Sequence, residues 1–191
     1  MKKTFTRLIA LGIILLAGAA CQFGDSPGTT EGSVPVDPEV AATLTDAGPE
    51  AAGQIIADSI LHAINLRRAE AGVPGLVSRE DLAGFAKLRS TDMSVRAYTG
   101  HEDPATGEDL LELMLAEAGY SGPAAELVFS SRTPPENLPV RLTEAWFEDP
   151  MHKALLLEPS FKYCGIGIAG EGGEWKVAVI LTIDLPEESN P

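Results

Sequence analysis

The amino-acid sequence predicts a single α+β domain of layered helices and antiparallel strands, preceded by a short apolar leader. Segments with helical periodicity come first along the chain and strand-like segments come last, which favours this class over a doubly wound α/β fold. The 191 residues are 45% hydrophobic and 22% charged, a composition typical of a globular domain. The domain is expected to occupy residues 50–186, followed by a short tail at residues 187–191.

The first 20 residues have the anatomy of a signal peptide. Three basic residues precede an uncharged apolar run from Leu8 to Ala20. This run is shorter than the roughly 20 apolar residues that a membrane-spanning helix needs. Small residues then stand directly before Cys21, which resembles the lipobox of bacterial lipoproteins and implies that Cys21 is acylated and anchors the chain to a membrane. The alternative is an ordinary cleavage site that happens to precede a cysteine.

The expected location is therefore extracytoplasmic, at the end of a lipid anchor. In a cell with two membranes, Gln22 after the anchor resembles lipoproteins sent to the outer membrane; with one membrane, the domain faces outward. Residues 21–49 are rich in Gly, Ser, Thr, Pro and Asp, which predicts a flexible tether. Without the leader, 11 basic and 28 acidic residues leave a formal charge of −17, which argues against nucleic acid and anionic lipid headgroups as partners.

The first two helices of the domain follow from apolar spacing. One begins near Glu50 and ends before Gly72, because isoleucines recur in it every four residues. They are Ile56, Ile60 and Ile64. The second follows Ser78, whose hydroxyl is expected to cap it, and carries an apolar face that includes Leu82 and Met93.

Two further helices are expected in the middle of the chain. Residues 108–118 lie between Gly107 and Gly119, and glycine at the second position suits a left-handed helix end. The next helix carries Trp146 and has Pro139 in its first turn, where a missing N–H is tolerated. Pro150 is expected to break it.

Strand-like segments complete the domain. Residues 126–129 form a short extended piece, and residues 163–169 and 175–183 predict a hairpin joined by the Gly-rich turn at 170–173. Cys164 lies in the first of these hairpin strands. If Cys21 is acylated, Cys164 has no disulfide partner within the chain, so it is expected to pack as a small buried apolar residue.

Two of the three histidines stand out as candidate site residues. His62 lies in the middle of a predicted helix and is expected to be a structural or surface residue. His101 and His152 lie where regular structure gives way, which is where binding and catalytic sites are commonly built.

Four motifs carry a family resemblance. They are Asn65 to Arg68, the Gly100-His101 corner, Trp146 followed by His152, and the Gly165-Ile-Gly-Ile strand. Together they resemble a bacterial CAP domain (cysteine-rich secretory protein, antigen 5, pathogenesis-related 1), also called SCP, over roughly residues 55–184. The resemblance implies an α-β-α sandwich of about four helices packed on a small antiparallel sheet.

The resemblance also implies a groove that carries two histidines and two acidic residues. Matched residue by residue, these are His101, Glu126, Asp149 and His152. Glu126 stands in Ala-Glu-Leu where the family usually has Gly-Glu-Asn, and the alternative acid is Glu136, which precedes Asn137. Because Glu136 leads into a predicted helix, the groove acid is assigned to Glu126.

Imidazole and carboxylate groups are the ligands that Zn²⁺ and similar divalent cations use. The four groove residues are therefore candidate metal ligands, and a divalent cation such as Zn²⁺ is the candidate cofactor. The alternative is that each histidine hydrogen-bonds a carboxylate and holds the groove together.

No catalytic residue is assigned from the sequence. A Gly-Xaa-Ser-Xaa-Gly motif, a cysteine nucleophile and a phosphate-binding glycine loop are all missing. The expected function is a membrane-anchored binding module whose partner is an envelope protein, a lipid or a cell-wall ligand. The alternatives are a metal-dependent hydrolase of cell-wall or peptide substrates and a carrier of hydrophobic ligands.

Overall fold

The computed structural model of the chain describes residues 44, 49–171 and 173–186. The predicted leader, Cys21, most of the tether and the tail at 187–191 lie outside these residues. None of the helices described is both long and apolar enough to cross a membrane. A four-stranded sheet forms the centre of the domain, in the order β1-β3-β4-β2. The strands are β1 (Val77–Ser78), β2 (Ala124–Ser131), β3 (Tyr163–Glu171) and β4 (Glu174–Thr182).

The sheet is mixed, whereas the sequence predicted an antiparallel one. β3 and β4 form the predicted hairpin, and β2 pairs antiparallel with β4 along its whole length. β1, however, runs parallel to β3, with Val77 opposite Tyr163 and Ser78 opposite Cys164. A strand of two residues is too short to have an alternating pattern, so nothing in the sequence indicated this pairing.

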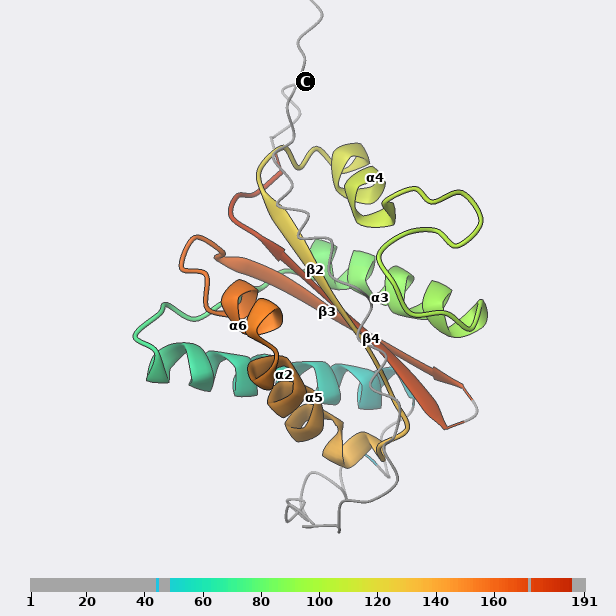
Figure 1. Cartoon of the computed structure of the whole chain (residues 1–191), viewed down its shortest axis with the longest axis horizontal. Helices are drawn as coiled ribbons and strands as arrows, with labels where there is room; N and C mark the ends of the chain where they lie inside the picture. Colours follow the sequence, from blue (N-terminus) through green and yellow to red (C-terminus); the bar gives the residue numbers. More distant parts are fainter. Residues whose placement is uncertain (1–43, 45–48, 172, 187–191) are drawn as a thin grey trace, which may run out of the picture.

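Helices cover both faces of the sheet, which gives the predicted α-β-α sandwich. Figure 1 shows α2, α5 and α6 gathered at the lower left of the sheet and α3 and α4 at the upper right. The helices are α2 (Pro49–Glu70), α3 (Glu80–Val95), α4 (Leu110–Glu117), α5 (Leu138–Glu148) and α6 (Pro150–Leu156), with a 3₁₀ turn, η1 (Pro135–Asn137), before α5. Pro139 lies in the first turn of α5, as predicted.

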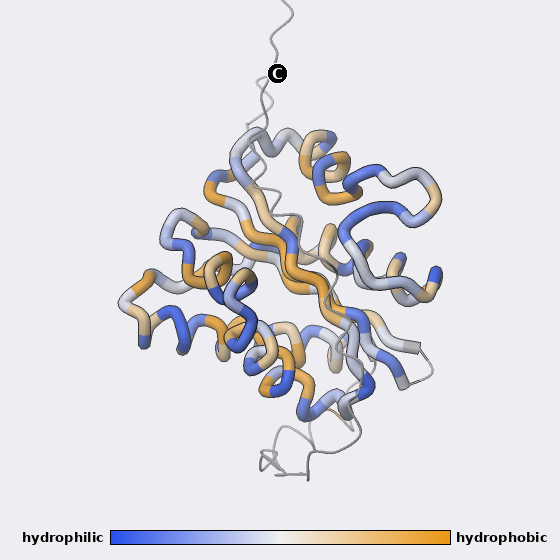
Figure 2. The backbone as a smooth tube through the Cα atoms, viewed as in Figure 1, coloured by the Kyte–Doolittle hydropathy of each residue, from blue (hydrophilic) through white to orange (hydrophobic). Residues whose placement is uncertain are grey.

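Each face of the sheet has its own apolar core, because side chains alternate along the strands. On β4, Val177, Val179 and Leu181 join the core with α2, α5 and α6, whereas Ala178 and Ile180 join the core with α3 and α4. The strands accordingly form the most hydrophobic band of Figure 2. The three isoleucines of α2 are all buried, which confirms the helix face predicted from their spacing.

The prediction that Ser78 caps the second helix is wrong. Ser78 belongs to β1, and α3 begins at Glu80 after Arg79, whose side chain makes no capping hydrogen bond. The Asp81 carboxylate instead accepts hydrogen bonds from the backbone N–H of Leu82 and from the guanidinium of Arg79. Pairing with β3 holds Ser78 in an extended strand, which places it one residue too early to cap the helix.

Two polar residues of the α2 motif hold the fold together. The side chain of Asn65 donates to the backbone oxygen of Leu76 and accepts from the N–H of the same residue, at 3.0 and 2.7 Å. Arg68 is fully buried, and its guanidinium donates to four backbone oxygens. These belong to Pro74, Leu156, Glu158 and Phe161. The motif therefore ties α2 to the segments before β1 and β3.

Candidate functional site

The first half of the candidate site joins His101 to strand β2. His101 lies in the segment after α3, and its Nδ1 is 3.0 Å from Oε2 of Glu126. Glu126 lies between Ala124 and Val128, which pack in the α3 core, so its side chain enters the domain on that side. The Glu126 side chain is only 2% exposed, whereas that of His101 is 28% exposed.

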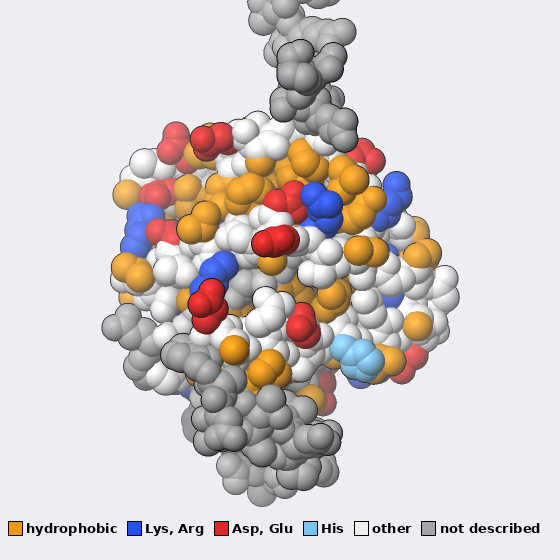
Figure 3. Space-filling view, turned by 180° about the vertical axis from the view of Figure 1, so that it is seen from behind, with side chains coloured by type: hydrophobic (Ala, Val, Ile, Leu, Met, Phe, Trp, Pro, Cys, Tyr) orange, Lys and Arg blue, Asp and Glu red, His pale blue; other side chains and the backbone are white. Residues whose placement is uncertain are grey.

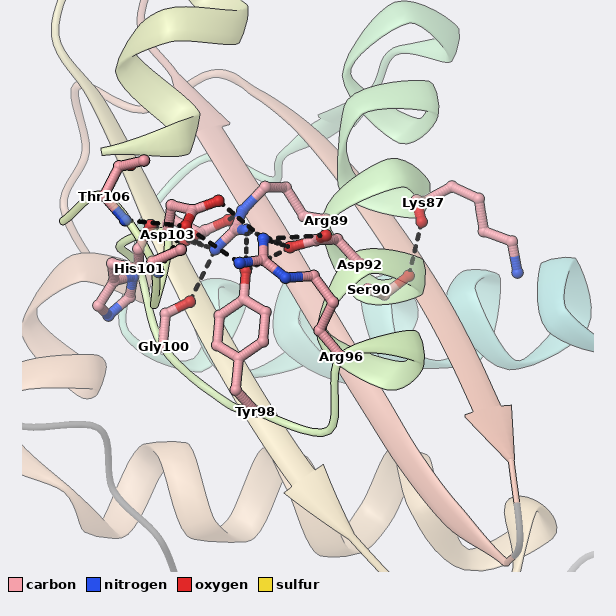
Figure 4. Close-up of polar contacts among 12 residues, drawn as sticks. Lys87, Arg89, Ser90, Asp92, Arg96, Tyr98, Gly100, His101, Asp103 and Thr106 are labelled. Carbon is pink, nitrogen blue, oxygen red and sulfur yellow. Dashed lines mark hydrogen bonds and ion pairs between the residues drawn. The ribbon is translucent and has the colours of Figure 1, made fainter. Parts of the chain in front are cut away.

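A buried arginine behind Glu126 completes this half of the site. Nε of Arg89 donates to Oε1 of Glu126 at 2.8 Å, and the Arg89 side chain is 1% exposed. Its other nitrogens donate to the Tyr98 hydroxyl at 2.9 Å and to the backbone oxygen of Gly100 at 2.7 Å. Figure 4 shows this guanidinium reaching from α3 toward the segment that carries His101.

The hydrogen bonds around Arg89 affect its charge and the donor role of His101. Burial by itself would lower the pKa of Arg89, but the hydrogen bond and negative charge of Glu126 raise that pKa above its usual range. Arg89 is therefore charged, and Nε and one terminal nitrogen of its guanidinium both donate to the Glu126 carboxylate. Because a carboxylate only accepts hydrogen bonds, Nδ1 of His101 is the donor in its contact with Glu126, and Nε2 is the ring nitrogen left for another partner.

Arg89 is a site residue that the sequence analysis missed. It lies on α3 between Ala86 and Met93, which are both fully buried on the apolar face of this helix. A charged residue on an apolar face is unusual, because burying a charge is costly unless it is paired. That position is the signal from which a buried partner could have been predicted.

The second half of the site lies where α5 ends and α6 begins. Asp149 caps α6, since its Oδ1 accepts from the backbone N–H groups of Met151 and His152, both at 2.9 Å. These hydrogen bonds lower the pKa of Asp149, chiefly through the N–H of His152. Nδ1 of His152 is also 3.2 Å from Oδ1 of Asp149, but this contact lacks the geometry of a hydrogen bond.

Two buried nitrogen atoms beside Asp149 have no hydrogen-bond partner in the described part of the chain. They are Nδ1 of His152 and Nε1 of Trp146. The centroids of these two rings are 6.4 Å apart. Burial lowers the pKa of His152, an effect that the charge of Asp149 opposes and that of His101 reinforces.

The four predicted residues thus form two acid-histidine pairs. Among the residues described, no three His, Cys, Asp or Glu side chains come together closely enough to hold a metal ion. Glu126 is engaged by Arg89 and Asp149 by the start of α6, which leaves the imidazoles as the available donors. The four-ligand set is not assembled as a coordination centre here, and cation binding stays a prediction.

The remaining candidates of the sequence analysis are also located. His62 is exposed on α2, in agreement with a surface role. Glu136, the alternative acid, lies in η1, and among the described residues no hydrogen bond or ion pair joins it to either site histidine. Cys164 is buried as predicted, and burial raises the pKa of its thiol to about 12.

The α-β-α sandwich is the fold that the CAP resemblance implied. Residues 61–184 match the cysteine-rich secretory protein family, CAP, and the chain belongs to this family. The chain is 24% identical over 116 residues to the uncharacterized protein YkwD of Bacillus subtilis, a match that covers 61% of this chain and 43% of that protein. The chain therefore spans less than half of that relative.

Solved structures share the fold. An extracellular protein containing an SCP domain from Bacillus anthracis superposes with a TM-score of 0.56 at 20% identity, over 72% of this chain and 44% of that one. An outer surface protein from Borrelia burgdorferi superposes with a TM-score of 0.54 at 14% identity, over 78% and 95% of the two chains. The first is an extracellular protein and the second an outer surface protein.

Proposed function

We propose that this chain is a lipid-anchored extracytoplasmic protein whose CAP domain binds a ligand through His101 and His152. The observation that carries the proposal is the buried Arg89–Glu126 ion pair directly behind a partly exposed histidine. Burying two charges is costly, and apolar residues of similar size would often stabilise the fold as well. The pair instead orients His101 and leaves its Nε2 available to an incoming ligand.

A divalent cation is the first ligand to test. Neutral imidazole nitrogen is a common ligand of Zn²⁺ and related ions, and the lowered pKa of His152 keeps its ring neutral at pH 7. Since Glu126 and Asp149 already have partners, binding should depend on the two imidazoles.

The test is calorimetric titration of Zn²⁺, Mg²⁺ and Ca²⁺ into the full chain purified in detergent. We expect saturable one-to-one binding that is lost when His101→Gln and His152→Gln are combined. The matched control is His62→Gln, which removes the exposed histidine of α2 and should leave binding unchanged. If the wild-type chain binds no ion, or if the control and the double variant lose binding equally, the cation assignment is wrong.

The anchor has a separate test. The proposal predicts that a Cys21→Ser variant moves from the membrane fraction to the soluble fraction and loses the mass of its acyl chains in intact-protein mass spectrometry. A Cys164→Ala variant should keep both the mass and the membrane location, because this thiol is buried in the domain. A soluble wild-type chain without acyl mass would contradict the anchor but not the binding site.

A further inference from the structure

A polar cleft is lined in part by the segments that precede the two histidines. It has a volume of about 380 Å³ and is formed by residues 97–99, the end of β2 with the segment that follows it, the outer side of α5 and the start of β4. The volume lies within the range of small-molecule and peptide sites. Thr99 lies two residues before His101, and Glu148 directly precedes Asp149, so two of the segments that line the cleft also carry candidate site residues.

A buried lysine organises one wall of the cleft. The side chain of Lys176 is 8% exposed, and its Nζ donates to Glu174 Oε1 at 2.6 Å. The same nitrogen donates to Oγ1 of Thr99 and to Oγ of Ser130, both at 2.9 Å. An ammonium group has three N–H donors, so Lys176 is fully used in joining the hairpin to the segment before His101.

The arginines of the cleft, by contrast, have donors to spare. Arg141 is exposed on α5, and no hydrogen bond or ion pair to another described residue engages its guanidinium. Arg132 is 72% exposed, and its nearest carboxylate oxygen, on Glu174, is 3.8 Å away. Every other arginine in the described part of the chain has a closer carboxylate or carbonyl partner. Those arginines are Arg67, Arg68, Arg79, Arg89 and Arg96.

The chain has 28 acidic and 14 basic residues, yet Arg141 pairs with no carboxylate among the described residues and Arg132 pairs with Glu174 only at 3.8 Å. A guanidinium matches a carboxylate with two parallel hydrogen bonds, so a carboxylate is the ligand group that these two side chains suit best. β2 is an edge strand, with β4 as its strand partner in the described sheet. An extended peptide can hydrogen-bond to such an edge, which favours a peptide over a small isolated acid.

We propose that the cleft binds an extended peptide whose carboxylate pairs with Arg141 and Arg132. Glu148, on the same helix as Arg141, also lines the cleft and is available for a hydrogen-bond donor of the peptide. This proposal deepens the proposed function, because it names a ligand class for a cleft beside the segments of His101 and His152. It rests on the proposed function only in assuming that this region binds a ligand.

The test compares two matched probes, N-acetyl tetra-alanine with a free carboxylate and the same peptide as its C-terminal amide. Each is titrated calorimetrically into the full chain in detergent. We expect the free acid to bind at least tenfold more tightly than the amide. An Arg141→Gln variant should abolish this difference, whereas Arg67→Gln, which removes the same charge from α2, should preserve it. Circular dichroism confirms that both variants are folded.

The outcomes separate this proposal from the histidine site. Equal affinity for acid and amide, or no binding of either, overturns the peptide proposal and leaves the histidine assignment to its own titration. If Arg141→Gln and Arg67→Gln lose the preference for the acid equally, the preference is a general charge effect, and the peptide proposal is also overturned. Preference for the acid that survives the His101→Gln, His152→Gln double variant but not Arg141→Gln supports the cleft, even if the histidines bind nothing.

Discussion

Arg89 and Glu126 form an ion pair whose side chains are 1% and 2% exposed, so neither charge can be solvated when its partner is missing. The Arg89→Met variant leaves the carboxylate of Glu126 buried with only His101 as a neighbour. We expect the free energy of unfolding, measured by urea denaturation, to fall by about 3–5 kcal/mol. Arg67→Gln, at an exposed position, should change it by less than about 0.5 kcal/mol.

A second variant distinguishes lost charge pairing from lost packing. Adding Glu126→Leu to Arg89→Met replaces the pair by apolar side chains and should recover much of the lost stability, because no uncompensated charge remains. A double variant that is as unstable as Arg89→Met alone would mean that the shape of the arginine, not its charge, supports the site.

His152 makes stability depend on pH. Burial lowers the pKa of its imidazole below 6.5 in the folded state, while the unfolded chain retains a value near 6.5. Below about pH 6.5 the unfolded state therefore binds more protons, and the free energy of unfolding decreases as the pH falls toward the folded-state pKa. Urea denaturation at pH 7.5, 6.5 and 5.5 should show this decrease.

The His152→Asn variant identifies the group responsible. Asparagine does not titrate, so the slope between pH 7.5 and 5.5 should become smaller in this variant. The carboxylates with lowered pKa values, among them Asp81 and Asp149, act at lower pH and leave this window unaffected. An unchanged slope in His152→Asn would assign the pH dependence to another group.

At the scale of elements, α3 lies unusually close to β3. Gly165 and Gly167 face this helix, and a methyl group at Gly165 would overlap the backbone of Leu82 and Ala83, just as one at Gly167 would overlap that of Ala86 and Lys87. Backbone on both sides cannot move away as a flexible side chain can. The close contact explains why the Gly-Ile-Gly-Ile strand of the family motif needs both glycines.

Gly167→Ala should therefore separate α3 from the sheet and lower the free energy of unfolding by about 1–3 kcal/mol or more. Gly84→Ala is the matched control, since Gly84 lies on the exposed side of the same helix with open space around it. That change should stabilise the protein by about 0.5–1 kcal/mol, because alanine loses less backbone entropy in a helix. Thermal denaturation of both variants tests whether Gly167→Ala lowers the stability and Gly84→Ala raises it.

At the scale of the whole molecule, the domain folds without a disulfide among the residues described. Cys164 is free and buried, with its pKa raised to about 12 by burial, so its thiol is unreactive in the folded state. If Cys21 is acylated, a thiol reagent such as Ellman's reagent should find no reactive thiol in the native protein and one after denaturation. Two thiols after denaturation would contradict acylation, and one in the native state would contradict the burial of Cys164.

The chain is strongly acidic, with 28 acidic and 14 basic residues. Figure 3 shows acidic side chains spread over the face opposite to that of Figure 1 rather than gathered in one patch. An acidic surface repels polyanions, whereas the cleft proposed above offers an anionic ligand the guanidinium groups of Arg132 and Arg141.

The sequence by itself determined the elements whose formation depends on local spacing. The isoleucines of α2, Pro139 in α5 and the glycine turn of the hairpin act over a few residues, so their periodicity predicts both the element and its buried side. The four candidate site residues were named by matching them to a family pattern, and their role stays a prediction. Their pairing into His101 with Glu126 and Asp149 with His152 was not visible from spacing.

Only the tertiary structure decided which distant groups meet. The parallel pairing of β1, the ion pair of Arg89 and the unpartnered nitrogens of Trp146 and His152 depend on contacts between segments that are far apart along the chain. Such contacts have no periodic signature, and their energy comes from burial that exists only once the layers have packed. For the same physical reason, the sequence could name His101 and His152 as candidates, whereas only the fold showed that each lies beside its acid, Glu126 or Asp149.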